Sequence, residues 1–204
     1  MLTINNHVFL FINAAAGASP AVVSVAAFVA SRLIDLIPVL LVVLWVWGKP
    51  ARRADLVASA IAAALALGAN QLVGLFWYEP RPFMIGLGRT LMAHVPENSF
   101  PSDHTTFILT VGFALVVTRA ARTWGTVVIA LGVLVAWARI YLGLHFPLDV
   151  VASALIAGLF GAVAALLVTP VGRWLMPVAD RTYEVALDAL RLPSRFFPRR
   201  QNRG

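Results

Sequence analysis

Three short polar clusters carry the residues whose types and spacing could do chemistry. They lie at 79–82, 99–106 and 139–149. Eight of their residues are candidates for a site, two histidines, two arginines, one of the serines and three carboxylates: His104, His145, Arg81, Arg139, Ser102, Glu79, Asp103 and Asp149. This set suits in-line attack on phosphorus, because cations hold the oxygens, one imidazole attacks and the other protonates the leaving oxygen. The clusters therefore predict phosphoryl transfer.

The first cluster centres on Arg81. Pro80 and Pro82 break any helix there and fix the backbone around the arginine. The planar guanidinium offers a fork of donors that matches a pair of phosphoryl oxygens. The alternative is an interfacial arginine whose head group reaches toward lipid headgroups.

The second cluster leads into an apolar run. Ser102 or Asp103 can cap a helix that begins here, and the first free N–H groups of that helix form an anion site. His104 in the first turn would point at the bound anion. The alternative is a simple capping sequence with an unrelated histidine.

The third cluster surrounds a second helix start, because Pro147 is favoured in a first helical turn. Asp149 can accept from one nitrogen of His145, which fixes the tautomer and leaves the other nitrogen as base or nucleophile. Arg139 lies six residues before the histidine. A purely structural histidine–aspartate pair is the alternative.

The rest of the chain is too apolar for a water-soluble enzyme. Only 12% of its 204 residues are charged, 60% are hydrophobic and the mean hydropathy is +0.85. The net charge of +7 does not indicate nucleic-acid binding, since the basic residues form no stripe interleaved with aromatics. We expect an all-α, polytopic membrane bundle.

Five apolar runs are candidates for transmembrane helices. They cover about 20–47, 55–77, 104–119, 124–142 and 149–169. Residues 6–12 and 180–192 read as amphipathic helices on the membrane surface, and 195–203 as a mobile basic tail near anionic lipid. We expect residues 1–204 to form a single domain, with 1–19 as an interfacial segment and 170–204 as a cytoplasmic helix and tail.

The basic residues orient these spans. Twelve of the 16 lie between spans one and two, between spans three and four, or after span five. By the positive-inside rule these regions face the cytoplasm, which places the N-terminus outside and the C-terminus inside. The three polar clusters then lie at the outer ends of helices.

The clusters resemble the motifs of the type-2 phosphatidic acid phosphatase superfamily, whose fold is the acid phosphatase and vanadium haloperoxidase core. The likeness covers about residues 70–150 and rests on Arg81-Pro82, on Pro101-Ser102-Asp103-His104, and on Arg139 with His145 and Asp149 at the spacing of the third motif. The chain departs from the pattern at three positions, where Gly74 replaces a lysine, Asp103 a glycine and Ala138 a serine. The residues around the first two motifs, 79–83 and 99–106, resemble those of the bacitracin-resistance branch, the undecaprenyl-diphosphate phosphatases.

The resemblance implies a role for each matching residue. His145 would attack phosphorus to form a phosphohistidine, Asp149 would orient it, and His104 would protonate the departing lipid phosphate. The phosphoryl oxygens would be bound by Arg81, Arg139 and the backbone around Ser102, with Glu79 and Asp103 as accessory residues of open role. The family works without a metal or other cofactor. The implied substrate is a polyprenyl diphosphate in the bacterial cytoplasmic membrane, with the site facing outward.

Other functions remain open on the sequence. The same motifs fit a phosphatidate or phosphatidylglycerophosphate phosphatase, whereas vanadate-dependent chloride peroxidases that share them are soluble. A metal-dependent hydrolase could use Glu79, Glu97, Asp103 and the histidines. From a different class, the chain could be a non-catalytic transporter subunit, because Arg32 and Asp35 lie inside the first span. We expect that pair to be a structural ion pair facing the bundle or an interfacial pair; the oligomeric state is open.

Overall fold

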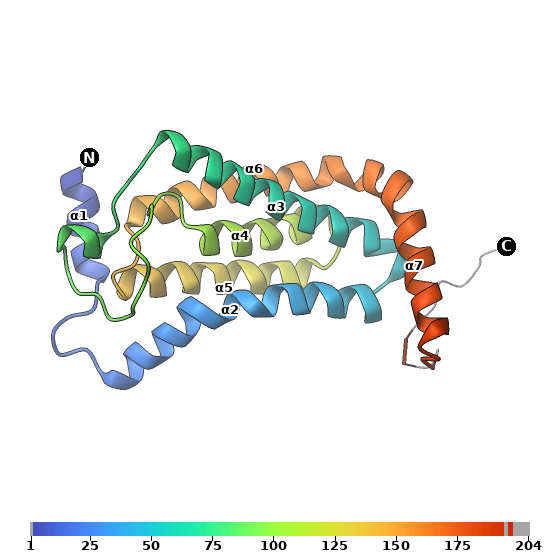
Figure 1. Ribbon diagram of the computed structural model, residues 1–204, viewed down its shortest axis with the longest axis horizontal. Helices are drawn as coiled ribbons and strands as arrows, with labels where there is room; N and C mark the ends of the chain where they lie inside the picture. Colours follow the sequence, from blue (N-terminus) through green and yellow to red (C-terminus); the bar gives the residue numbers. More distant parts are fainter. Residues whose placement is uncertain (1, 194–195, 198–204) are drawn as a thin grey trace.

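The fold is a helical bundle. The computed structural model describes residues 2–193, 196 and 197, and no β-strand occurs among them. Five helices run along the long axis, and two shorter ones lie across its ends (Figure 1). Their bounds are α1 Leu2–Ile12, α2 Pro20–Trp47, α3 Arg53–Phe76, α4 Asp103–Val117, α5 Arg122–Tyr141, α6 Pro147–Pro170 and α7 Met176–Ala189.

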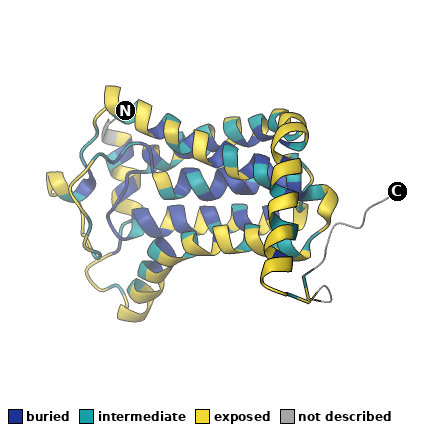
Figure 2. Cartoon of the chain, turned by 45° about the vertical axis from the view of Figure 1, so that its right-hand side comes forward, coloured by how far each residue is buried: buried dark blue, intermediate teal, exposed yellow. Residues whose placement is uncertain are grey.

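Helix α4 forms the centre of the bundle. It packs against α3, α5 and α6, while α2 packs mainly against α5. Buried residues gather on the inward faces and exposed apolar residues on the outward faces (Figure 2). That distribution is typical of a bundle in lipid, where each helix satisfies its own backbone hydrogen bonds.

Among the residues that the structure describes, four helical segments are long and apolar enough to cross a membrane, and α4 is a shorter apolar helix of 15 residues. The expectation of five apolar runs is thus confirmed, although the central run is too short to meet that length criterion. It packs against α3, α5 and α6, and most residues between Thr105 and Leu115 are buried.

Glycines allow the central helices to approach closely. A Cβ added at Gly161 of α6 would lie 2.5 Å from the Cβ of Phe113 on α4. A Cβ added at Gly125 of α5 would lie 2.9 Å from the carbonyl oxygen of Gly112 on α4. These small residues bring the elements that carry the second and third polar clusters into contact.

Helix α1 covers one end of the bundle. It begins at Leu2, earlier than the predicted residue 6. Phe9 is fully buried against Phe146, and Asn5 accepts a hydrogen bond from the backbone N–H of Leu148, at 3.1 Å. Phe11 projects outward on the other face, where it is 91% exposed. The helix therefore anchors the start of α6 while presenting apolar side chains outward.

The predicted break after residue 169 is wrong. Helix α6 continues through a π-helical turn, Val171–Leu175, directly into α7, which begins at Met176 rather than at residue 180. The physical reason is that Pro177 falls in the first turn of α7, where its missing N–H is tolerated, and the wider turn absorbs the change in direction. Of the predicted basic tail, only residues 196 and 197 belong to the described part of the chain.

Helix α7 is held across the far end of the bundle by Arg53. This arginine is 1% exposed and donates to Asp180 of α7 at 2.9 Å. Its guanidinium also lies over the rings of Trp45 and Tyr183, at 5.1 and 4.7 Å from their centroids. The end of the bundle opposite α1 is thereby closed by charged and aromatic contacts.

One expectation for the first span is corrected. Arg32 and Asp35 do not form an ion pair facing the bundle, because both residues are exposed on the outward side of α2. In the part of the chain that the structure describes, no ion pair of 4.0 Å or less joins them. The inward face of α2 is formed instead by Ala26, Ala30 and Ile37.

The close approach of α4 and α6 predicts that Gly161→Ala destabilises the fold, since the contacted atom is a Cβ that cannot rotate away. Overpacking of this kind costs about 1–3 kcal/mol, so the melting temperature in detergent should fall by several degrees. Gly158→Ala on the same helix is the control, because nothing lies within 4 Å of its added Cβ. Equal melting temperatures for the two variants would contradict this account of the packing.

Candidate active site

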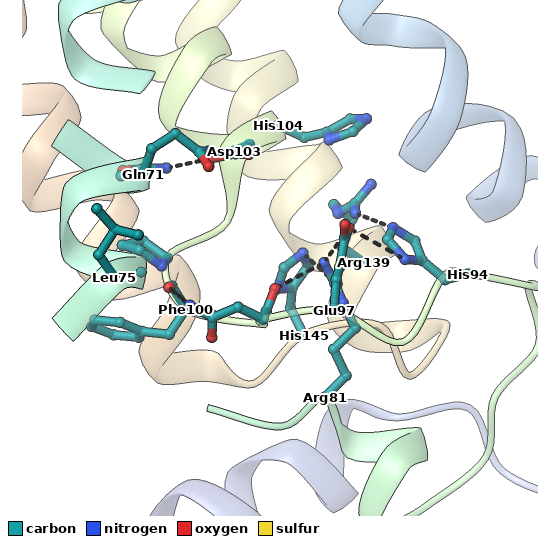
Figure 3. Close-up of a pocket in the computed structure, with 14 residues that line it drawn as sticks. Gln71, Leu75, Arg81, His94, Glu97, Phe100, Asp103, His104, Arg139 and His145 are labelled. Carbon is teal, nitrogen blue, oxygen red and sulfur yellow. Dashed lines mark hydrogen bonds and ion pairs between the residues drawn. The ribbon is translucent and has the colours of Figure 1, made fainter. Parts of the chain in front are cut away.

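The three polar clusters meet in one pocket at the end of the bundle covered by α1. Its volume is about 360 Å³. His104, His145, Arg81, Arg139 and Asp103 all line it (Figure 3). The other lining residues are Asn70, Gln71, Gly74, Leu75, His94, Glu97, Asn98, Phe100 and Pro101.

His145 lies at the start of α6 and is only 2% exposed. Its Nδ1 is 3.1 Å from Oδ2 of Asp149, and its Nε2 is 3.1 Å from Nη1 of Arg81. Because the guanidinium can only donate, Nε2 accepts and Nδ1 carries the hydrogen. Burial lowers the pKa of the His145 imidazole well below its ordinary value, and the nearby Arg139 and Arg81 lower it further. The site thus contains a neutral imidazole with a fixed tautomer.

Asp149 is fixed by two more donors. The backbone N–H of Phe146 donates to its Oδ2 at 2.8 Å, and the hydroxyl of Ser99 donates to the same oxygen. Ser99 Oγ is also 3.2 Å from Nδ1 of His145. The carboxylate therefore has no rotational freedom, and the imidazole plane is set by a loop serine as well as by α6.

Arg81 is 4% exposed and, besides Nε2 of His145, is held by three further acceptors. These are the carbonyl oxygens of Leu144 and Asn98, at 3.0 and 3.2 Å, and Oε1 of Glu97, at 3.1 Å. Its buried Nε has no hydrogen-bond partner among the described residues. A buried unpaired donor is costly, so an acceptor brought to Nε by a ligand would remove that cost.

Arg139, in the last turn of α5, repeats this arrangement. It is 3% exposed and donates through Nη1 to the carbonyl oxygen of Ala30 at 3.1 Å. Its buried Nε has no hydrogen-bond partner among the described residues. Its Nη2 is 3.2 Å from Nε2 of His94. Two buried cations with free donors in one pocket favour an anion with several oxygens.

His104 lies in the first turn of α4, as predicted, and lines the same pocket as His145. Figure 3 shows the two imidazoles with the Arg139 guanidinium between them in this view. The pocket therefore contains two histidines from different helix starts.

The second cluster is partly used for structure. The backbone N–H of Ser102 donates to Oγ of Ser153 at 2.8 Å, and its hydroxyl pairs with that of Thr105. Ser102 is fully buried and does not line the pocket. Asp103 does line it, and accepts from the amides of Asn70 and Gln71 at 2.8 and 3.2 Å.

Glu79 is not among the residues that line the pocket. Its backbone N–H donates to Oδ1 of Asn98 at 2.9 Å, and its carbonyl accepts from the N–H of Ser99. Asn98 also donates to the carbonyls of Trp77 and Phe100. The side chain of Asn98 thus organises the loop that carries Arg81 and Ser99.

Sequence reasoning missed several of these residues. It gave no role to Asn98 or Ser99, offered His94 only a contact with the head group or diphosphate, and used Glu97 only in the metal-dependent alternative. A weak signal existed for Ser99, which lies within the second cluster. None existed for Asn98, because side chains that bridge irregular loops follow no period.

The missing lysine also has a structural counterpart. Gly74 lines the pocket, and a Cβ added there would lie 3.0 Å from Nδ2 of Asn98. A side chain at this position would therefore enter the pocket where Asn98 now lies. Among the described residues, no group of three or more histidines and carboxylates is placed to hold a metal ion.

The chain is similar to three curated proteins over most of its length. It is 39% identical over 166 residues to YbjG of Escherichia coli K12, whose name provisionally assigns it as an undecaprenyl-diphosphatase; the match covers 81% of this chain and 82% of the relative. It is 32% identical over 138 residues to undecaprenyl-diphosphatase BcrC of Bacillus subtilis 168, covering 68% and 70%. It is 30% identical over 166 residues to the bacitracin transport permease protein BcrC of Bacillus licheniformis, covering 81% and 79%.

Two crystal structures share the fold. LpxE of Aquifex aeolicus superposes with a TM-score of 0.61 at 25% identity, covering 79% of this chain and 94% of that protein. A phosphatidylglycerolphosphate phosphatase from Bacillus subtilis, described as a transmembrane PAP2 type, superposes with a TM-score of 0.50 at 16% identity, covering 82% of each chain. Residues 55–173 match the PAP2 superfamily, and the match includes all three polar clusters. The predicted family and fold class are confirmed: this chain belongs to the PAP2 superfamily.

Proposed function

We propose that this protein is a membrane phosphatase that hydrolyses undecaprenyl diphosphate to the monophosphate and inorganic phosphate. The observation that carries the proposal is the pair of buried arginines, Arg81 and Arg139, in a pocket that His94, His104 and His145 also line. Nε of each arginine has no hydrogen-bond partner among the described residues. The names of the curated relatives point to the same lipid diphosphate. Membership of the PAP2 superfamily and the apolar helices support a lipid phosphatase in a membrane.

In the first half of the proposed reaction, His145 is the nucleophile. Its Nε2 lone pair forms a bond to the terminal phosphorus while the bond from that phosphorus to the bridging oxygen breaks. The electron pair leaves with the bridging oxygen, and His104 gives that oxygen a proton. Arg81 turns from Nε2 of His145 toward the phosphoryl oxygens, which Arg139 also binds.

In the second half, water replaces the imidazole. The deprotonated His104 takes a proton from the water as its oxygen bonds to phosphorus, and the phosphorus–nitrogen bond breaks. Inorganic phosphate leaves, and both histidines return to their starting states. Asp149 and Ser99 act as positioning residues, because they hold Nδ1 protonated and so keep Nε2 free to attack.

The surface beside the pocket supports a lipid substrate. Leu75 lines the pocket and is 77% exposed, and the neighbouring Leu72 and Phe76 on α3 are also exposed. A diphosphate bound by the arginines could extend its hydrocarbon tail along this face. Phosphatidate and phosphatidylglycerophosphate also carry a terminal phosphoryl group. Selection of undecaprenyl diphosphate over these two lipids therefore depends on recognition of the hydrocarbon tail.

We place the site on the outer face of the membrane, with the N-terminus outside and the C-terminus in the cytoplasm. Lys49, Arg53, Arg122 and Arg173 lie at the helix ends opposite the pocket, together with α7. An excess of basic residues at that end supports a cytoplasmic location for it. We further propose that the whole chain acts as one domain.

A transporter subunit is a second candidate, favoured by the permease name of the Bacillus licheniformis relative. The two functions differ in whether they need His145. If His145→Ala still protects cells from bacitracin, transport explains the protection; if protection is lost while the protein remains in the membrane, hydrolysis explains it.

Phosphate release from undecaprenyl diphosphate is the central test. The detergent-purified protein should release phosphate in the presence of a chelator, and faster from this lipid than from phosphatidate. His145→Ala and His104→Ala should each lower turnover by at least about a hundredfold, because one removes the nucleophile and the other the proton donor. His7→Ala is the control, since His7 is exposed on α1. Turnover that survives in either pocket variant would end this assignment of roles.

The second prediction concerns the protonation of His145. Because its pKa lies below the ordinary value of 6.5, the imidazole should stay neutral, with hydrogen on Nδ1, when the free protein is brought to pH 6.5. Protonation, and with it loss of the nucleophile, should occur only at lower pH. NMR titration of 15N-histidine-labelled protein measures this, with His145→Ala to assign the signal. A midpoint at or above 6.5 would contradict the proposed neutral tautomer.

The third prediction tests the side of the membrane. The chain contains no cysteine, so single cysteines report position without background. A membrane-impermeant maleimide should label Thr90→Cys, in the exposed loop beside the pocket, on intact cells. It should label Lys49→Cys, at the opposite end, only after permeabilisation. The reverse pattern would place the pocket in the cytoplasm.

A further inference from the structure

Helix α2 presents two opposite charges away from the bundle. Arg32 and Asp35 are the only charged residues of this 28-residue helix, and both are exposed. Neither side chain forms a hydrogen bond or ion pair with another residue in the range 2–193. Charged side chains on the lipid-facing side of a span are costly unless they are paired. A binding partner that paired Arg32 and Asp35 would remove this cost.

The two charges belong to a regular stripe. Exposed residues recur along α2 in steps of three and four: Val25, Phe28, Arg32, Asp35, Val39 and Val42. This is the 3.5-residue spacing of a coiled-coil seam, in which side chains of one helix enter holes on another. Helix α2 packs mainly against α5. The six residues are exposed, so none of the described residues covers this stripe. We call these six residues the α2 seam.

We propose that the α2 seam is the interface between two copies of this chain, related by a two-fold axis along the bundle, with Arg32 of each copy paired to Asp35 of the other. Two copies in one membrane share the same orientation, so their α2 helices run parallel. A two-fold axis presents the same face of both, and opposite charges three residues apart then pair in both directions. The valines and Phe28 pack above and below the four charges.

Charge complementarity favours a second copy over a different partner. A helix of another protein would need an acidic and a basic residue at the same positions along the helix axis. A second copy of α2 already has both, as Asp35 and Arg32. The interface would also lie near the pocket, because the carbonyl of Ala30, two residues before Arg32, accepts from Arg139. The inference stands on α2 alone and does not depend on the proposed reaction.

Single cysteines test the contact in native membranes. Val39→Cys lies on the α2 seam and is 58% exposed, and Leu159→Cys on α6 is the matched control, at 63%. Under mild oxidation, Val39→Cys should form a disulfide-linked dimer at least about tenfold faster than Leu159→Cys, because only the seam holds the two thiols together. Equal rates for the two variants would mean random collision and would overturn the proposal.

Charge exchange tests the pairing within the same cross-linking assay. In the Val39→Cys background, Arg32→Asp should lower cross-linking several-fold, since four acids then meet at the interface. Adding Asp35→Arg to that variant should restore it. Unchanged cross-linking in the single variant, or no recovery in the exchanged one, would refute the paired charges.

The unaltered chain provides a measurement that does not depend on how variants fold. The mass of the protein in lipid nanodiscs, determined by light scattering, should correspond to two copies. A single copy at every lipid-to-protein ratio would overturn the dimer. Phosphate release by each charge variant checks that its bundle is intact, because Arg32 and Asp35 do not line the pocket.

Discussion

Two buried guanidinium groups in one apolar bundle constrain everything around the pocket. Like charges repel and burial removes their water, so Arg81 and Arg139 need acceptors that are fixed in place. Backbone carbonyls from three separate segments provide them, at Ala30, Asn98 and Leu144. Helix α2, packed against α5, and the loop before α4 each supply one of these acceptors. The remaining free donors prepare the site for an anion.

His145, just before α6, is also held by fixed hydrogen bonds. One carboxylate oxygen of Asp149 receives a backbone N–H, a serine hydroxyl and the imidazole. The acid therefore caps the helix and orients His145 at once. Loop and helix must fold together before the imidazole takes its tautomer, which links the chemistry of the site to the packing of the outer end of the bundle.

Hydropathy and charge were sufficient to predict the helices and the end of the bundle where the polar clusters meet. Strong apolar runs and a few ionisable residues at their ends leave few alternative arrangements. The continuity of α6 and α7 was missed because the apolar run ends near residue 169 and the amphipathic pattern begins only near 180, whereas a π turn joins the two helices. Asn98 was missed because its partners are backbone atoms of an irregular loop. The outward position of Arg32 was missed because helical spacing gives no direction without a known neighbour.

The shortness of α4 sets the depth at which the protein works. Fifteen residues rise only about 22 Å, while the hydrocarbon core of a bilayer is about 30 Å thick. At least one end of α4 therefore lies below the level of the surrounding phosphates. If His104 marks the sunken end, a charged headgroup must descend several ångströms to reach it, and local thinning of the bilayer around the bundle would shorten that descent. Membrane thickness then becomes part of the barrier to substrate entry.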